Sequence, residues 1–266
     1  MTQTHHGTAL ITGASSGIGA VYADRLARRG YDLILVARNR ERLISLANRI
    51  TTETRRNVEI MDADLSDKDG LAVVEAKLRQ DATITLLVNN AGVGTHTPLL
   101  GSNVDATSRM IDLNVSALTR LTYAAVPGLV SRGKGAVINI SSVVAIAPEI
   151  LNGVYGGSKA FVLAFSQSLH HELADKGVQV QAVLPGATAT EFWQTGGLPL
   201  ENLDKAIVMS ADDMVDAALT GFDRRELVTI PSLHAVEKWE AYEAARGAMS
   251  TLLSSNIPAP RYTAAQ

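Results

Sequence analysis

Thr12-Gly-Ala-Ser-Ser-Gly-Ile-Gly19 follows the apolar run Thr8–Ile11 and precedes a helix-like segment that Gly30 closes. An apolar run, three glycines and a helix-like segment in this order predict a strand, a tight turn and a helix. Glycines permit the sharp turn, a close approach of the backbone to a pyrophosphate, and packing of the helix on the strand. The N–H groups that begin the helix favour an anion. The stretch therefore predicts a phosphate-binding turn, although its G-x-x-x-G-x-G spacing differs from the commoner G-x-G-x-x-G.

Strand-like and helix-like segments alternate through the rest of the chain. Residues 32–37 form a continuous apolar run after Asp32, which is typical of a strand buried on both faces of a parallel sheet. Similar patterns indicate further strands near 58–61, 84–88, 136–140, 178–184 and 227–230, and helices near 43–50, 71–78, 104–130, 154–175, 211–222 and 235–253. We therefore expect an α/β fold with a doubly wound, mostly parallel, Rossmann-like sheet and helices on both faces.

The composition argues against several classes of function. A net charge of −3 without a long basic run disfavours a nucleic-acid partner. The absence of cysteine excludes a disulfide framework, a thiolate metal site and a cysteine nucleophile. Because neither a signal peptide nor a membrane-spanning run is recognisable, we expect a cytoplasmic protein that needs no membrane partner. No metal site is predicted, since a solvated terminus explains His5-His6 and the adjacent His170 and His171 point to different helix faces.

Polar or glycine-containing turns follow three of the predicted strands. Asn89-Asn-Ala-Gly92 follows the strand near 84–88, Ser141-Ser142 follows the strand near 136–140, and Pro185-Gly186 follows the strand near 178–184. Ligands of doubly wound sheets bind outside the carboxyl ends of the strands. We therefore expect these turns to meet at one edge of the sheet.

Tyr155 and Lys159 are four residues apart near the start of a predicted helix, so their side chains share a face. An ammonium group beside a phenol favours the phenolate, and each unit of pKa change represents about 1.4 kcal/mol. In isolation, such a pair is better explained as a surface pair on an ordinary helix. Its significance comes from the motifs around it.

Six motifs together closely resemble the compact, single-domain form of the short-chain dehydrogenase/reductase family, over residues 8 to 230. They are Thr12-Gly-Ala-Ser-Ser-Gly-Ile-Gly19, Asn89-Asn-Ala-Gly92, Asn114 in Asp112-Leu-Asn-Val115, Ser142, Tyr155-Gly-Gly-Ser-Lys159 and Pro185-Gly186. The resemblance implies an NADP(H)-dependent oxidoreductase that interconverts a small-molecule carbonyl compound and a secondary alcohol by hydride transfer. The alternatives are an NAD-dependent alcohol dehydrogenase of the same family and a non-catalytic dinucleotide-binding protein. A nucleoside-triphosphate enzyme is disfavoured because no Lys followed by Ser or Thr ends the glycine-rich loop.

The resemblance also implies catalytic roles. Tyr155 would be the general acid of reduction and the general base of oxidation. Ser142 would polarise the carbonyl oxygen, and Lys159 would lower the pKa of Tyr155 and bind the nicotinamide ribose. Asn114 would hold a water molecule that links Lys159 to bulk solvent. The nicotinamide would supply the hydride.

The cofactor-binding residues that the resemblance implies extend from the first turn to the last third of the chain. They are Gly13, Ser15, Ser16, Gly17, Ile18, Gly19, Arg38, Asp64, Asn90, Gly92, Tyr155, Lys159, Pro185, Gly186, Thr188 and Thr190. The second strand ends in Arg38 with no acid at its tip, and Asp32 lies at its start. A guanidinium group binds the 2′-phosphate of NADP, which a carboxylate would repel. Arg38 therefore predicts NADP rather than NAD. Many NADP-preferring relatives carry a second basic residue where this chain has Ser16, and Arg40 or a serine hydroxyl would compensate.

We expect residues 1–266 to form a single dinucleotide-binding and catalytic domain, with a substrate lid at about 187–203 and a loosely ordered tail at about 254–266. Gly196-Gly197 beside Phe192-Trp193 favours a mobile lid. The expected walls of the substrate site are mainly apolar, which indicates a hydrophobic carbonyl compound. Because relatives of this kind form dimers or tetramers, the resemblance also implies a homo-oligomer.

Overall fold

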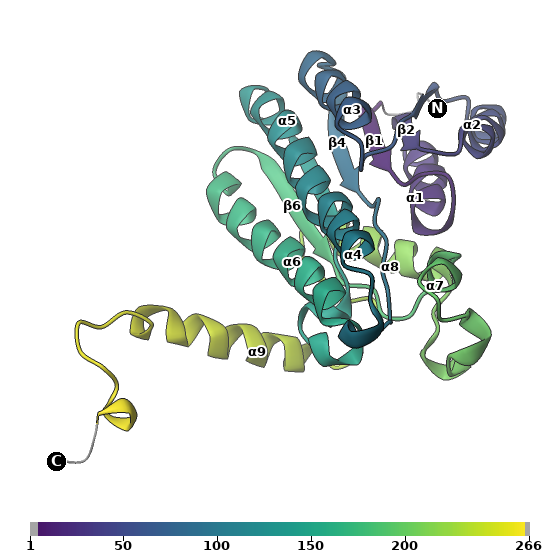
Figure 1. The fold of residues 1–266 in the computed structure, drawn as a ribbon. Coiled ribbons are helices and arrows are strands. Elements are labelled where there is room, and N and C mark those ends of the chain that lie inside the picture. The colour runs from purple at the N-terminus through teal and green to yellow at the C-terminus, as the bar shows by residue number, and fades with distance from the viewer. Residues whose placement is uncertain (1–4, 264–266) are drawn as a thin grey trace. The chain divides into compact units, whose positions relative to one another are not determined.

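Within residues 5–263, which the computed structural model describes, seven parallel strands form one sheet in the order β3-β2-β1-β4-β5-β6-β7 (Figure 1). The strands are β1 Thr8–Thr12, β2 Asp32–Ala37, β3 Val58–Asp62, β4 Ile84–Asn89, β5 Gly135–Ile140, β6 Val178–Val183 and β7 Val228–Thr229. The continuous apolar sequences of β1, β2 and β4 suit strands whose two faces are covered by helices. The strand order reverses between β1 and β4, where a doubly wound sheet binds its ligand. The predicted fold class is confirmed.

Helices connect the strands of this sheet. They are α1 Gly17–Arg28, α2 Arg40–Thr54, α3 Lys68–Gln80, α4 Val104–Ile111, α5 Leu118–Ser131, α6 Gly153–Leu173, α7 Phe192–Thr195 and α8 Ala211–Asp223. Apolar residues of α1, α2 and α8 pack on one face, and those of α3 and α5 pack on the other, beside α6 (Figure 1). Polar side chains such as Asn39 and Asp67 cap the helices that follow the strands. The strand ends and helix starts are thereby gathered at one edge of the sheet.

The helix predicted near 104–130 contains a different kind of turn. The chain remains helical from α4 to α5, but Asp112–Ala117 between them adopts the wider π-helical form. Short π-helical segments inside α-helices are frequent at functional sites. This segment contains Asn114, whose side chain is buried.

Residues from Leu233 onward form a second compact unit. It contains α9 Val236–Met249 and short 3-10 turns at Ser250–Leu252 and Pro260–Tyr262. The single domain over 1–266 and the loosely ordered tail stay predictions. In residues 5–263, no helix is long and apolar enough to cross a membrane.

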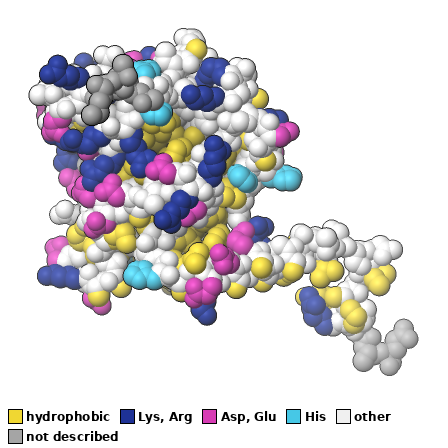
Figure 2. Space-filling model, turned by 180° about the vertical axis from the view of Figure 1, so that it is seen from behind, with side chains coloured by type: hydrophobic (Ala, Val, Ile, Leu, Met, Phe, Trp, Pro, Cys, Tyr) yellow, Lys and Arg dark blue, Asp and Glu magenta, His cyan; other side chains and the backbone are white. Residues whose placement is uncertain are grey.

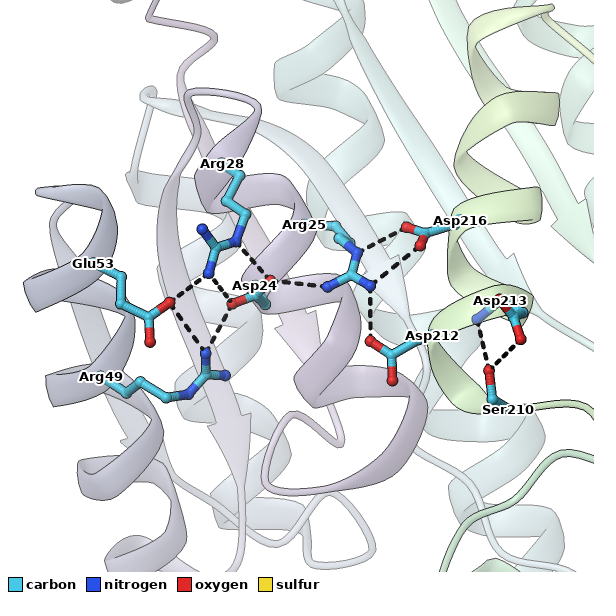
Figure 3. A network of polar contacts seen from close by, with 9 residues as sticks. All are labelled: Asp24, Arg25, Arg28, Arg49, Glu53, Ser210, Asp212, Asp213 and Asp216. Carbon is cyan, nitrogen blue, oxygen red and sulfur yellow. Dashed lines mark hydrogen bonds and ion pairs between the residues drawn. The ribbon is translucent and has the colours of Figure 1, made fainter.

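An ion-pair network joins α1 to α2 and α8 (Figure 3). At its centre Asp24 is only 5% exposed and accepts hydrogen bonds from Arg25, Arg28 and Arg49. The network extends through the pairs Arg28–Glu53, Arg49–Glu53, Arg25–Asp212 and Arg25–Asp216. On the face seen from behind, Lys and Arg side chains lie among Asp and Glu side chains (Figure 2). The network therefore holds α1, α2 and α8 together on one face of the sheet.

Asp24→Asn is expected to lower the free energy of unfolding by about 1–3 kcal/mol at neutral pH, because three guanidinium groups lose their shared carboxylate and each unit of its pKa shift represents about 1.4 kcal/mol. Burial raises the pKa of Asp24, but hydrogen bonds from Arg28, Arg49 and Arg25 outweigh it and hold the pKa at about 2, below its ordinary 3.8. The stabilisation by the Asp24 carboxylate is therefore complete above its unfolded-state pKa. It is lost as the pH falls through its folded-state pKa. Urea unfolding at neutral and acid pH measures both effects.

The matched control for this prediction is Asp223→Asn. Asp223 also pairs with an arginine of this face, Arg29, but its side chain is 58% exposed. Exposed pairs contribute little, so this change should cost less than about 1 kcal/mol. An equal loss in both variants would contradict the central role of Asp24.

Candidate active site

The turn after β1 has a backbone that depends on glycine. Gly13 and Gly17 have φ values of +65° and +53°, which side-chain-bearing residues rarely adopt. A Cβ atom on Gly19 would lie 2.3 Å from the Gly13 carbonyl oxygen. The Asn90 side-chain amide donates to the carbonyl oxygen of Thr12 at 2.9 Å and holds the turn against the end of β4. The turn therefore lets the backbone at the beginning of α1 approach a bound anion closely, as the binding of a dinucleotide diphosphate requires.

The structure brings Ser142, Tyr155 and Lys159 together at the carboxyl end of β5. Asn152 caps α6 by accepting from the backbone N–H of Tyr155 at 3.3 Å, which fixes the first turn of the helix. Tyr155 is buried, and the Ser142 hydroxyl lies near enough to it to favour its ionised form. One turn along α6, the Lys159 ammonium donates to the carbonyl oxygen of Ile140 at 2.9 Å and lies 5.9 Å from the centroid of the Tyr155 ring.

The electrostatics of this pair are dominated by burial. Burial raises the pKa of Tyr155 to about 12, against a smaller lowering by the hydrogen bond with Ser142. Burial lowers the pKa of Lys159 to about 8. The sequence led us to expect a Tyr155 pKa lowered by Lys159, but in this structure the pKa of the phenol lies above its ordinary value. At neutral pH the phenol therefore keeps its proton and the ammonium keeps its charge.

Asn114 connects the loop after β4 to α6. Its side chain accepts from the backbone N–H of Val93 at 3.0 Å and donates to the Val93 carbonyl oxygen at 2.8 Å. It also donates to Ser158 at 3.2 Å. A Cβ on Gly92 would lie 3.1 Å from the Asn114 side-chain oxygen and 3.4 Å from the Lys159 ammonium, so this loop passes close to both. Ser158 lies within the Tyr155-Gly-Gly-Ser-Lys159 motif, but the spacing of that motif does not indicate a contact with Asn114.

Arg38 and Asp64 lie near each other at the carboxyl ends of β2 and β3. The Arg38 side chain is 72% exposed, and its nearest paired carboxylate oxygen, on Asp64, is 4.0 Å away. Asp64 also accepts from the backbone N–H of Ser66 at 2.9 Å, so it shapes the turn after β3. By contrast, Arg40 is paired with Asp62 at 2.8 Å. Arg38 is thus the less engaged of these two guanidinium groups.

The residues after β6 connect the phosphate turn with the site around Ser142. The carbonyl oxygen of Pro185 accepts from Ser142 at 3.4 Å, and Gly186 accepts from the Thr188 hydroxyl at 3.1 Å. Thr190 lies against the turn, because a Cβ on Gly17 would be 3.0 Å from its methyl group. Together with Ser15, Ser16 and Ile18 of the turn, the predicted cofactor-binding residues therefore lie along one edge of the sheet.

The predicted lid contains α7, which packs over the site. The rings of Phe192 and Tyr155 lie 5.7 Å apart, and a Cβ on Gly94 would be 2.3 Å from the Phe192 ring. His96 contacts the carbonyl oxygen of Gly196 at 2.8 Å and so ties the loop after β4 to the lid. The sequence pattern did not predict the contacts of Gly94 and His96 with the lid, because these residues lie about 100 positions away from it in the chain.

A pocket of about 650 Å³ opens beside the start of α6. Its lining consists of His96, Pro98, Leu99, Ile150, Leu151, Asn152, Gly153, Val154 and Leu198. Most of these side chains are apolar and none is an acid, a lysine or an arginine. The pocket therefore suits an uncharged, largely apolar molecule.

Comparison with known proteins gives a consistent set of relatives. A family model described as short chain dehydrogenase matches residues 7–197. A short-chain dehydrogenase from Sphingobium yanoikuyae, solved in complex with NADPH, is 50% identical with a TM-score of 0.93, over 96% of this chain and 100% of that chain. The bulky-bulky ketone specific alcohol dehydrogenase from Comamonas testosteroni is 46% identical with a TM-score of 0.89, over 97% and 99%. An uncharacterized oxidoreductase of Staphylococcus epidermidis is 32% identical over 215 residues, which are 78% of this chain and 92% of that protein.

Proposed function

The chain belongs to the short-chain dehydrogenase/reductase family of NAD(P)-dependent oxidoreductases, and on that basis we propose that it interconverts a carbonyl compound and a secondary alcohol with NADP(H). The observation that carries the proposal is the burial of Tyr155 and Lys159 beside Ser142 at the carboxyl end of β5. A non-catalytic dinucleotide-binding protein would not need this set of buried polar side chains, whose desolvation costs free energy.

Tyr155 and Ser142 handle the substrate oxygen in this proposal. During reduction the carbonyl carbon gains a hydride, and the Tyr155 hydroxyl gives its proton to the oxygen. Ser142 donates a hydrogen bond to the same oxygen and stabilises the negative charge that develops there. In the oxidation direction, Tyr155 takes the proton back from the alcohol. The bound nicotinamide supplies or accepts the hydride.

Lys159 and Asn114 assist proton transfer at Tyr155 in this proposal. The Lys159 ammonium is held near the ring by the Ile140 carbonyl, so its charge favours the phenolate after the proton has left. We propose that Lys159 also binds the nicotinamide ribose and that Asn114 holds a water molecule in a proton path to solvent. The buried position of Asn114 against Val93 and near Gly92 supports that role.

The residues present fit an NADP(H) molecule. A Cβ on Gly13 or Gly19 would meet Asn90 or the Gly13 carbonyl oxygen, so the turn requires glycine at these positions, as a tight diphosphate-binding turn does. Arg38 is exposed at the end of β2 and only loosely paired, as a ligand for the 2′-phosphate should be. The relative from Sphingobium yanoikuyae, with 50% identity, was solved with NADPH. Asp64, Asn90, Gly92, Pro185, Gly186, Thr188 and Thr190 complete the proposed binding residues.

The substrate that we propose is a hydrophobic ketone or the corresponding alcohol. The pocket beside α6 is mainly apolar, and the relative from Comamonas testosteroni is specific for bulky-bulky ketones. We further propose a homodimer or homotetramer in the cytoplasm, on the basis of the family resemblance and the composition. A panel of diaryl and alkyl-aryl ketones with NADPH, followed by the loss of NADPH fluorescence, tests the reaction. Failure to turn over any ketone or secondary alcohol would contradict the proposed function.

Arg38→Gln is expected to weaken NADPH binding about 10- to 100-fold, which is the usual contribution of a hydrogen bond to a charged group. NADH has no 2′-phosphate, so its affinity should change by less than about threefold. Fluorescence titration of both cofactors at the same salt concentration measures the two effects. The matched control is Arg40→Gln, since Arg40 lies two residues away but is paired with Asp62. Equal weakening of NADPH and NADH would contradict the assignment of Arg38.

A further inference from the structure

Arg42 and Glu191 form an ion pair across the carboxyl edge of the sheet. Their side chains meet at 2.6 Å. Arg42 lies in the first turn of α2, just after β2, whereas Glu191 precedes α7 and follows β6. Three strands, β1, β4 and β5, separate β2 from β6 in the sheet. Four spacings of about 4.8 Å place these two strands roughly 19 Å apart. The two chain segments must therefore extend over the edge of the sheet to meet.

The phosphate turn lies between the two ends of this bridge. The turn follows β1, which is adjacent to β2 on one side and to β4 on the other. Thr190, the neighbour of Glu191, already touches the turn at Gly17, as the 3.0 Å approach of its methyl group to a Cβ there indicates. The ion pair thus holds the first residues of the lid next to the turn that a dinucleotide diphosphate would contact.

Charge gives a second reason for the pair. Glu191 stands beside Thr190, which touches the phosphate turn, and an unpaired carboxylate there would repel the phosphates of a dinucleotide. Arg42 donates directly to that carboxylate and offsets its charge. Arg40 and Arg38, the neighbouring basic residues, are directed to Asp62 and Asp64 instead. Arg42 is therefore the arginine of this group that connects α2 to the lid.

We propose that Arg42 and Glu191 are positioning residues that hold the segment 188–195 over the phosphate turn and slow the departure of bound NADP(H). The proposal rests on the proposed function, because it takes the bound dinucleotide to be NADP(H). The two side chains are 48% and 59% exposed. Exposed ion pairs contribute modestly, so the pair can open at each turnover and should change the dissociation rate by roughly two- to fivefold.

Glu191→Gln is expected to raise the dissociation rate of NADPH roughly two- to fivefold, because the lid segment loses its tie to α2. Stopped-flow mixing of the NADPH complex with excess NADP⁺ follows this rate through the fluorescence of bound NADPH. Arg42→Gln should raise the rate at least as much, because it also leaves the Glu191 carboxylate unpaired, and the double variant should match Glu191→Gln. The charge exchange Arg42→Glu with Glu191→Arg should return the rate toward that of the wild type. High salt should reduce the difference between wild type and Glu191→Gln.

The matched control is Asp223→Asn, which breaks an exposed arginine–carboxylate pair away from the edge of the sheet. The side chains of Asp223 and Glu191 are almost equally exposed, at 58% and 59%. An equal acceleration by Asp223→Asn, an unchanged rate in Glu191→Gln, or a charge exchange without recovery would each overturn the role of the pair. These results leave the proposed function standing, whereas a wild type that binds no NADPH would overturn both proposals.

Discussion

Tyr155→Phe is expected to lower kcat for ketone reduction about 10²- to 10⁴-fold, which is the usual contribution of a general acid. The variant keeps the ring, and therefore keeps its packing against Phe192 at 5.7 Å and the course of α6. The affinity for NADPH should change by less than about tenfold, because the hydroxyl makes at most one neutral hydrogen bond. Steady-state kinetics with NADPH and an aryl ketone, together with fluorescence titration, separate the two effects.

Tyr22→Phe provides a matched control for the loss of a buried hydroxyl. Tyr22 lies in α1 within the apolar core, and its hydroxyl has no hydrogen-bond partner among the residues that the structure describes. Burial raises the pKa of this phenol as well. The control should leave kcat unchanged, because a high pKa and burial alone give Tyr22 no role in proton transfer. Near-normal turnover by Tyr155→Phe would remove Tyr155 from its assigned role.

The sequence predicted the parts of the fold that depend on local patterns. The apolar run 32–37 coincides with β2, and the turn from Gly13 to Gly19 lies between β1 and α1 as expected. Motifs that follow β4, β5 and β6 meet at one edge because parallel strands share a direction. Tyr155 and Lys159 share a face of α6 because helical spacing requires it. The family resemblance then brought the separate motifs into one site.

The sequence did not predict features that depend on contacts between distant segments. The π-helical turn at Asp112–Ala117 has no sign in the apolar pattern of the helix. The raised pKa of Tyr155 follows from its burial by residues of several elements, including Val144 and Phe192. The pair between Arg42 and Glu191 joins residues 149 positions apart, so neither charge pattern nor spacing indicates it. In each case the tertiary packing, rather than the local sequence, determines the result.

Lys159→Met is expected to yield an almost inactive protein that is more stable than the wild type. Burial lowers the pKa of Lys159 from 10.5 to about 8, so the folded state bears a cost for the charged ammonium. A shift of that size corresponds to roughly 3 kcal/mol. Methionine is similar in length and apolar, although the carbonyl of Ile140 then loses its donor at a cost of about 1 kcal/mol. We expect a net gain of about 1–3 kcal/mol in the free energy of unfolding, with kcat reduced about 10²-fold or more.

The pH dependence tests the cause of this gain. Because the pKa of Lys159 is lower in the folded state, the unfolded state binds the proton more tightly, and the penalty is complete below pH of about 8. This penalty disappears as the pH rises toward the ordinary lysine pKa of 10.5. Urea unfolding between these limits should therefore show a gain of Lys159→Met over the wild type that shrinks as the pH rises, while the exposed control Lys134→Met follows the wild type. A variant that is less stable than the wild type at every pH would mean that the ammonium supports the fold through Ile140. A variant that is more stable than the wild type, with a gain that shrinks as the pH rises, would mean that the buried Lys159 ammonium beside Tyr155 destabilises the fold.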